Sequence, residues 1–155
     1  MIDFDVIEQV LDSNFSNNAM GLCRDLFNEN PEYRYNHKFN KASVVMPEKG
    51  VSVTFEKKAA ECLFFHFNGD DDADIASCAL DVISLNKSST PADLKNKYKE
   101  YNVVEEPLNA DDEHSTINYT LTFIINKICI RAQFNDNNTL SLLSAIKEEN
   151  LPSNG

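Results

Sequence analysis

An unbroken alternation of apolar and polar residues over positions 117–134 is the strongest pattern in the chain. The segments INYTLTFII and KICIRAQF both place an apolar side chain at every second position. Because side chains of a β-strand point alternately to its two faces, this pattern predicts two strands that each bury one face. A two-residue turn at 126–127 would place all these apolar residues on one side of a hairpin. The cross-strand pairs are then Ile125 with Ile128, Phe123 with Ile130 and Tyr119 with Phe134.

Two further strands are predicted in the middle of the chain. After Gly50, residues 51–55 alternate in VSVTF, and the polar stretch 56–61 is expected to form a turn. The next segment, CLFFHF at 62–67, is apolar on both faces, which predicts a central strand covered on each side. Asn68-Gly69 then has the composition of a tight turn.

Three segments carry weaker strand signals. Residues 33–39 alternate weakly, and residues 80–85 form a short apolar stretch. The spacing of apolar residues in 139–149 fits a helix about as well as a strand. A strand is favoured there because a third antiparallel neighbour would complete a meander. VSVTFEKKAAECLFF and ICIRAQFNDNNTLSLL share an order of strand, Phe, polar turn and apolar strand, but two matches do not establish a repeat.

Helical periodicity marks residues 3–28, where apolar residues recur every three or four positions. Residues 14–18 interrupt the run, and Ser16 can cap a second helix. A later helix is predicted at about 91–100, since Thr90 is a suitable N-cap and proline is favoured at the next position. Its core-facing pair is Leu94 and Tyr98.

These elements predict an α+β fold. N-terminal helices would pack on a mainly antiparallel β-meander sheet, with the helix at about 91–100 between two hairpin halves. The length of 155 residues suits one domain over 1–150, and the polar end at 151–155 is expected to be a flexible tail.

The charge balance limits the classes of partner. Fourteen Lys and Arg against 25 Asp and Glu give a formal net charge of −11. Nucleic acids and anionic membranes attract basic surfaces, so neither is an expected partner. A negative field instead attracts basic partners and speeds association with them. The same charge also aids solubility, whatever the partner.

The cysteines and the N-terminus favour a cytoplasmic protein. The four cysteines are far apart, with no C-x-x-C and no Cys-His pair at metal-ligand spacing. The opening residues MIDFDVIEQV lack the basic and apolar regions of a secretion signal. We therefore expect reduced thiols, no metal and no cofactor. The cysteines are Cys23, Cys62, Cys78 and Cys129.

No familiar catalytic motif is present. The chain lacks G-x-S-x-G, H-E-x-x-H, a P-loop and G-x-G-x-x-G, and its three histidines lie in unrelated segments. The run from Asp70 has acidic residues at positions 1, 3, 5 and 12 of a calcium loop. However, Ile75 stands at position 6, where the sharp turn requires glycine. We therefore expect a binding protein without enzymatic activity.

Two acidic clusters are the candidate partner-binding residues. Clustered carboxylates repel one another and add nothing to folding stability, so a cationic partner is one explanation and simple solvated turns are the other. Aromatic residues near them can supply an apolar anchor. The candidates are Asp70, Asp71, Asp72 and Asp74, then Asp111, Asp112 and Glu113, with Phe67 and Tyr119 as anchors.

The order of KGVSVTFEKKAAECLFFHF, a TPADLKNKYKE helix and a β-meander resembles bacterial immunity proteins of polymorphic-toxin and contact-dependent growth-inhibition systems. The resemblance covers roughly residues 30–147. It implies a protein that binds a cognate toxin directly and blocks its active site, without catalytic residues. We expect a monomer in the absence of the partner, because no helix carries the sustained heptad pattern of a coiled-coil dimer. The negative charge favours a basic toxin such as a nuclease.

A secretion chaperone is the alternative, because such chaperones are also small, acidic α+β proteins. It would bind an effector segment along an apolar surface, usually as a dimer. A C-terminal helix at 140–149 would favour the chaperone, and a closed meander would favour the immunity protein.

Overall fold

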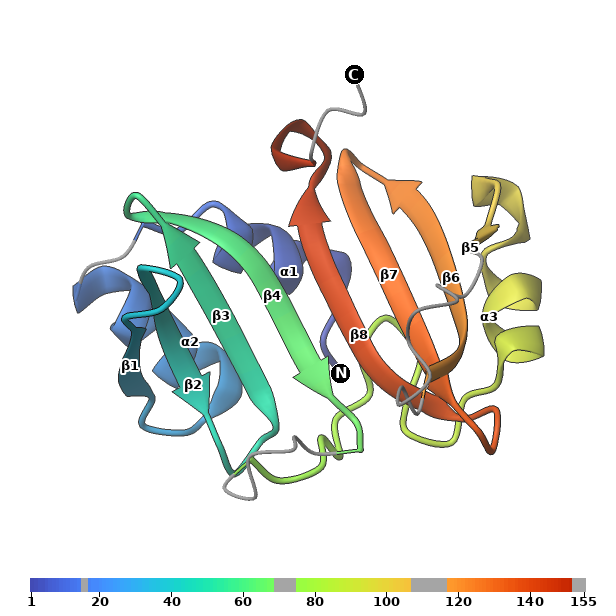
Figure 1. Cartoon of the computed structure of the whole chain (residues 1–155), viewed down its shortest axis with the longest axis horizontal. Helices are drawn as coiled ribbons and strands as arrows, with labels where there is room; N and C mark the ends of the chain where they lie inside the picture. The colour runs from blue at the N-terminus through green and yellow to red at the C-terminus, as the bar shows by residue number, and fades with distance from the viewer. Residues whose placement is uncertain (15–16, 69–74, 107–116, 152–155) are drawn as a thin grey trace.

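The computed structural model describes residues 1–14, 17–68, 75–106 and 117–151. Within these ranges, three α-helices accompany one eight-stranded antiparallel sheet (Figure 1). The helices are α1 (Phe4–Leu11), α2 (Asn17–Phe27) and α3 (Pro91–Lys97), with 3-10 turns η1 (Lys99–Tyr101) and η2 (Glu148–Asn150). The strands are β1 (Glu32–Asn36), β2 (Lys41–Met46), β3 (Val51–Glu56), β4 (Ala59–His66), β5 (Val104–Glu106), β6 (Ile117–Ile125), β7 (Ile128–Asn135) and β8 (Leu140–Lys147). The chain therefore has the predicted α+β fold.

The sheet consists of two four-stranded meanders joined at their last strands. Its order is β1-β2-β3-β4-β8-β7-β6-β5, so β4 and β8 pair at the centre. Figure 1 shows the two meanders as the left and right halves of the molecule. In the sequence, α1 and α2 precede the strands of the first half, and α3 precedes the strands of the second half. The expected helix between two halves is confirmed.

The central pairing has the register of a two-fold relation between the halves. Leu63 lies opposite Ala145, Phe64 opposite Ser144 and Phe65 opposite Leu143. Phe55 pairs with Ala60 and Phe134 pairs with Leu140, so the turn of the second hairpin is one residue longer. Beyond the turns, Leu63 is therefore equivalent to Leu143 and Phe65 to Ala145. Each residue therefore pairs with the equivalent of its partner, as a two-fold axis between Phe64 and Ser144 requires.

The same relation extends to a β-bulge in each half. The β3–β4 register shifts between Thr54 and Phe55, and the β7–β8 register shifts immediately before the matching phenylalanine, Phe134. Each shift inserts one residue into the last strand, Glu61 in β4 and Ser141 in β8. The sequence similarity between the two hairpins thus corresponds to a shared backbone irregularity.

The hairpin predicted at 117–134 is confirmed in register. β6 and β7 pair through the three expected cross-strand pairs, and Asn126 and Lys127 both have positive φ values, as a two-residue turn requires. The ambiguous segment at 139–149 is a strand, β8, paired with β7. It forms the third strand of the meander because its apolar residues meet the covered faces of β4 and β7.

Several local expectations were wrong. Strand β2 was not predicted from the sequence because its apolar residues do not alternate with polar ones. Its three buried residues follow each other at the end of the strand. The turn expected over 56–61 contains two residues, Lys57 and Lys58, both with positive φ. Lysine is not typical of such turns, so a two-residue turn at these positions could not be predicted from residue type. The strand expected at 33–39 ends at Asn36, and Phe39 lies in the following turn.

The apolar stretch at 80–85 is a tight turn instead of a strand. Ile83 and Ser84 have positive φ values, and the backbones of Val82 and Leu85 form two hydrogen bonds across them. The backbone of Ile2 bonds to this turn on both sides, through Asp81 O and Ile83 N. The turn is apolar because its side chains enter the core, where Val82, Ile83 and Leu85 are buried.

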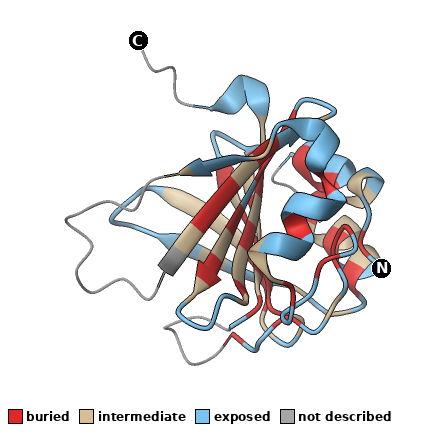
Figure 2. Cartoon of the chain, turned by 90° about the vertical axis from the view of Figure 1, so that its right-hand side faces the viewer, coloured by how far each residue is buried: buried red, intermediate tan, exposed pale blue. Residues whose placement is uncertain are grey.

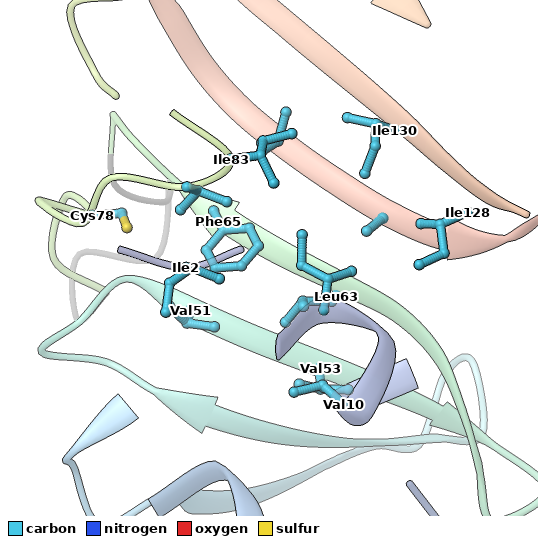
Figure 3. Packing of buried hydrophobic residues seen from close by; sticks show 14 of the residues in the cluster. Ile2, Val10, Val51, Val53, Leu63, Phe65, Cys78, Ile83, Ile128 and Ile130 are labelled. Atoms are coloured by element: carbon cyan, nitrogen blue, oxygen red, sulfur yellow. The ribbon is translucent and has the colours of Figure 1, made fainter. Parts of the chain in front are cut away.

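Helices cover one face of the sheet, and the core lies between them. Helix α1 contacts β4 and β8, and Phe27 of α2 meets Phe65 edge-on. Thr90 and Asp93 form a capping box on α3, while Leu94 and Tyr98 face the core as predicted. Figure 3 shows side chains from α1, β3, β4 and β7 meeting in one cluster. This cluster includes residues from both halves of the sheet.

Candidate partner-binding surface

The sheet face opposite the helices is the first candidate surface. Figure 2 shows the helices on one side of the sheet, and no described residue forms a helix on the other side. The expectation that strand 62–67 is covered on both faces was therefore wrong in one respect. Strand β4 is central, but Cys62, Phe64 and His66 alternate with the core residues and point to the open face, where each is half-buried.

A groove of about 480 Å³ lies on this open face. Phe64 and Ile146 contribute its apolar surface together with the thiols of Cys62 and Cys129, and Leu151 lies at its margin. The register aligns Cys62, Ile146 and Cys129 across three neighbouring strands. Along the same row, Ile124 of β6 is 41% exposed, so apolar surface continues beyond the groove. The open face thus combines an apolar strip with charged borders.

Two ion pairs border the groove. On β2 and β4, Lys41 Nζ lies 2.8 Å from Glu61 Oε1. On β7 and β5, Arg131 Nη2 lies 2.9 Å from Glu106 Oε2. The Lys41 pKa is raised, first by its hydrogen bond to Glu61. Exposed pairs of this kind contribute at most about 1 kcal/mol each, so their main effect is to fix four charges at known places on the face.

The two carboxylates differ in how completely they are bonded. Glu106 uses both oxygens, because Oε1 accepts from Thr122 at 2.7 Å and Oε2 accepts from Arg131. Glu61 Oε1 accepts from Lys41, whereas Glu61 Oε2 is buried and has no hydrogen-bond partner. A buried polar atom without a partner costs roughly 1–3 kcal/mol. Such atoms are rare in native proteins, which marks Glu61 as a residue that the fold itself does not satisfy.

A serine–histidine contact lies on the same face. Ser52 Oγ and His66 Nε2 are 2.8 Å apart, joining β3 to β4. A hydroxyl beside an imidazole is part of the machinery of nucleophilic catalysis. Ser52, however, is 8% exposed in the interior of a sheet. This burial favours a cross-strand structural hydrogen bond.

The thiols are protonated at neutral pH. Burial raises the pKa of Cys62 to about 12 and that of Cys23 to about 11, and it also raises the pKa values of Cys78 and Cys129. Reactive and metal-binding cysteines need the thiolate form. All four cysteines are free, as expected, and they contribute as small apolar side chains.

A second candidate surface is acidic and lies along α1. Asp5, Glu8 and Asp12 follow each other on the exposed side of the helix, and Lys147 Nζ lies 2.6 Å from Asp12. This contact brings the acidic turn η2 beside the end of α1. A groove of about 490 Å³ between them is lined by four carboxylates and two ammonium groups. The charged residues are Glu8, Asp12, Glu148 and Glu149, with Lys127 and Lys147.

This acidic groove was not predicted from the sequence, because the carboxylates around it come from opposite ends of the chain. Asp5, Glu8 and Asp12 are spaced as the outer side of any amphipathic helix. Glu148 and Glu149 follow a strand that was itself ambiguous. A signal was nevertheless present, since the first 23 residues contain four acidic residues and no basic ones.

The candidates chosen from the sequence have different positions. The acidic clusters Asp70, Asp71, Asp72 and Asp74, and Asp111, Asp112 and Glu113, lie outside the described residues. Phe67 is 1% exposed, because it continues the core-facing alternation of Leu63 and Phe65, so it is not available as a surface anchor. Tyr119 is half-buried on the helix-covered side, where its hydroxyl lies 2.6 Å from Lys95 Nζ of α3.

The described residues contain no group of three or more His, Cys, Asp or Glu side chains arranged to hold a metal ion. Among the same residues, no helix has the length and apolar character needed to cross a membrane.

Comparisons with protein-family models, with curated proteins and with solved structures found no match for this chain.

Proposed function

We propose that the protein is an immunity protein that binds a basic toxin domain, such as a nuclease, and blocks its active site. The observation that carries this proposal is the combination of a sheet face that no described helix covers with an acidic groove at the end of α1. A nuclease must bind phosphates, so its cleft is cationic. An acidic protein can occupy such a cleft and exclude nucleic acid.

The topology also supports this function over the alternative. Residues 140–147 form a strand in a meander, whereas a C-terminal helix would have favoured a secretion chaperone. The exposed apolar residues Val104 and Ile124 on the open face still suit a bound effector segment, so the chaperone stays the second candidate. We expect the immunity protein to be a cytoplasmic monomer without its toxin, whereas a chaperone is expected to be a dimer.

The test uses the protein encoded by the adjacent gene. If that gene encodes a secreted toxin, co-expression with this chain should restore growth, and the two proteins should form a one-to-one complex. The double variant Asp5→Asn, Glu8→Gln removes two charges from the exposed side of α1 without changing its shape. The rate at which this double variant associates with the toxin should fall severalfold at low salt, and that rate should depend less on the salt concentration.

The matched control is Glu105→Gln with Asp25→Asn, which removes the same charge elsewhere. If both double variants behave alike, the charge acts through overall attraction and the groove along α1 is not the contact. A toxin that stays active in the presence of excess protein would overturn the proposal. A type III effector encoded by the adjacent gene would replace it with the chaperone.

A further inference from the structure

The β-bulge in β4 determines the direction of Glu61. Thr54 pairs with Cys62 and Phe55 pairs with Ala60, so Glu61 is the inserted residue without a partner on β3. Consecutive residues of a regular strand point to opposite faces, but Glu61 and Cys62 both line the open-face groove. Bulges commonly redirect a side chain in this way near binding sites. The bulge therefore adds a carboxylate to an otherwise apolar strip.

Glu61 is only partly used by the fold. Lys41 bonds to one oxygen, and the other is buried without a donor, although the side chain as a whole is 24% exposed. The terminal torsion of a glutamate is soft, so the carboxylate can rotate its second oxygen toward the groove while the flexible Lys41 side chain follows the first oxygen. A donor entering the groove would then complete the hydrogen bonds of Glu61. Glu106, whose two oxygens are both bonded, has no such requirement.

We propose that this groove binds an arginine or lysine side chain flanked by apolar residues, presented by an extended segment of the basic partner. The cation would donate to the unpartnered oxygen of Glu61, and the flanking residues would lie on Phe64 and Ile146. Charge complementarity selects this occupant, since the chain carries a net charge of −11 and both cations that line the groove, Lys41 and Arg131, are already paired. The second oxygen of Glu61 is then an incompletely bonded carboxylate oxygen beside apolar surface. This proposal rests on the proposed function and specifies where one contact is made.

A short peptide tests the groove without the toxin. The probe is acetyl-Leu-Arg-Leu-amide, titrated into ¹⁵N-labelled protein while amide chemical shifts are followed. We expect shifts concentrated at residues 61–64 and 144–147, with weak millimolar affinity. The matched probe acetyl-Leu-citrulline-Leu-amide has nearly the same shape without the charge, and it should bind at least several times more weakly.

Two variants separate the carboxylate of interest from its neighbour. Glu61→Gln should remove most of the response to the arginine peptide, whereas Glu106→Gln should reduce that response much less, because both oxygens of Glu106 are already bonded. Thermal melts of both variants establish that they are folded. Because the change is nearly isosteric and the pair with Lys41 is half-exposed, Glu61→Gln is expected to fold.

The possible results either support or overturn the proposal. Equal binding of the two peptides, unchanged binding to Glu61→Gln, or shifts confined to the acidic groove along α1 would each overturn it. Failure of the peptide titration leaves toxin neutralisation intact and contradicts the groove. Failure of toxin neutralisation with a positive titration contradicts the proposed partner but keeps the groove as a cation-binding site.

Discussion

The two halves of the sheet share a backbone plan but use its irregularity differently. In the second half, both oxygens of the bulge residue Ser141 are hydrogen-bonded, because its carbonyl accepts from the backbones of Phe67 and Asn68 and its hydroxyl accepts from Asn68 Nδ2. In the first half, the bulge residue Glu61 has one oxygen bonded to Lys41 and one without a partner. The inserted residue thus links β4 and β8 by hydrogen bonds at one end of the pair. At the other end, the inserted Glu61 has a buried oxygen without a hydrogen-bond partner.

The two bulge residues therefore differ in role: Ser141 stabilises the fold, whereas Glu61 is the residue that we propose for binding. Ser141 ties the end of β4 to β8 through hydrogen bonds that the fold itself completes. Glu61 adds no comparable link between the halves, and burying its unpartnered oxygen opposes folding. Residues that oppose folding locally are typical of functional sites, since a ligand can supply the missing interaction.

The largest expected effect comes from placing a charge in the core of either half. Phe123→Asp in the second half and Val53→Asp in the first should each destabilise the protein by about 4 kcal/mol or more, because each buries an unpaired carboxylate. The two residues belong to one core cluster, so each variant should unfold both halves together. Urea unfolding followed by circular dichroism and by amide NMR signals measures this.

A conservative change at the same positions provides the control. Phe123→Leu and Val53→Ala should keep the native spectrum and lower the urea midpoint moderately. If Val53→Asp left native signals in β6 and β7, the halves would be separate folding units, and their two-fold pairing would contribute little to stability.

High pH should lower the stability of the folded protein through position 62 of the first half, but not through the equivalent position of the second half. Burial raises the pKa of Cys62 from 9.0 to about 12, whereas the equivalent position in the second half is Leu142, which cannot ionise. A raised folded-state pKa favours the protonated form, so this stability is fully present below pH 9 and is lost as the pH rises towards 12. Cys23, with a pKa of about 11, and Tyr98, with a pKa of about 12, act in the same direction.

The variant Cys62→Ala isolates this contribution. Its midpoint in urea should lie below that of the parent at pH 7, because apolar contacts are lost, and should fall less steeply between pH 9 and 11. Parallel curves for the two proteins would show that Cys62 does not ionise on unfolding in this range. Circular dichroism at several pH values is sufficient for the comparison.

The smallest effect distinguishes the two glutamates. Glu106→Gln weakens bonds to both Thr122 and Arg131, and we expect a loss of about 1 kcal/mol or less because the pair is exposed. Glu61→Gln should cost less, since it weakens the bond to Lys41 alone. Thermal melts under identical conditions measure the order. A larger loss for Glu61→Gln would mean that Glu61 is mainly a structural residue.

The elements in which hydrophobic pattern and local chemistry agree could be predicted from the residues alone. Alternation specified the register of the β6–β7 hairpin between Tyr119 and Phe134, because a shift of one position would turn every apolar side chain to the wrong face. Capping chemistry specified α3 through Thr90, Pro91 and Asp93. The fold class followed from these elements. Strand β2 and the Lys57-Lys58 turn were not recognised, because neither has the residues that such structures usually select.

The surfaces that these elements form depend on contacts between segments that are far apart in the chain. Both faces of CLFFHF are apolar, so the sequence could not show that one of them lacks a helical cover. The bulge that turns Glu61 into the groove depends on pairing with β3, and the acidic groove depends on Lys147 meeting Asp12, 135 positions earlier in the chain. Local patterns encode which face of each element is buried. Contacts between distant elements decide which of the remaining polar groups meet and which one is left without a partner.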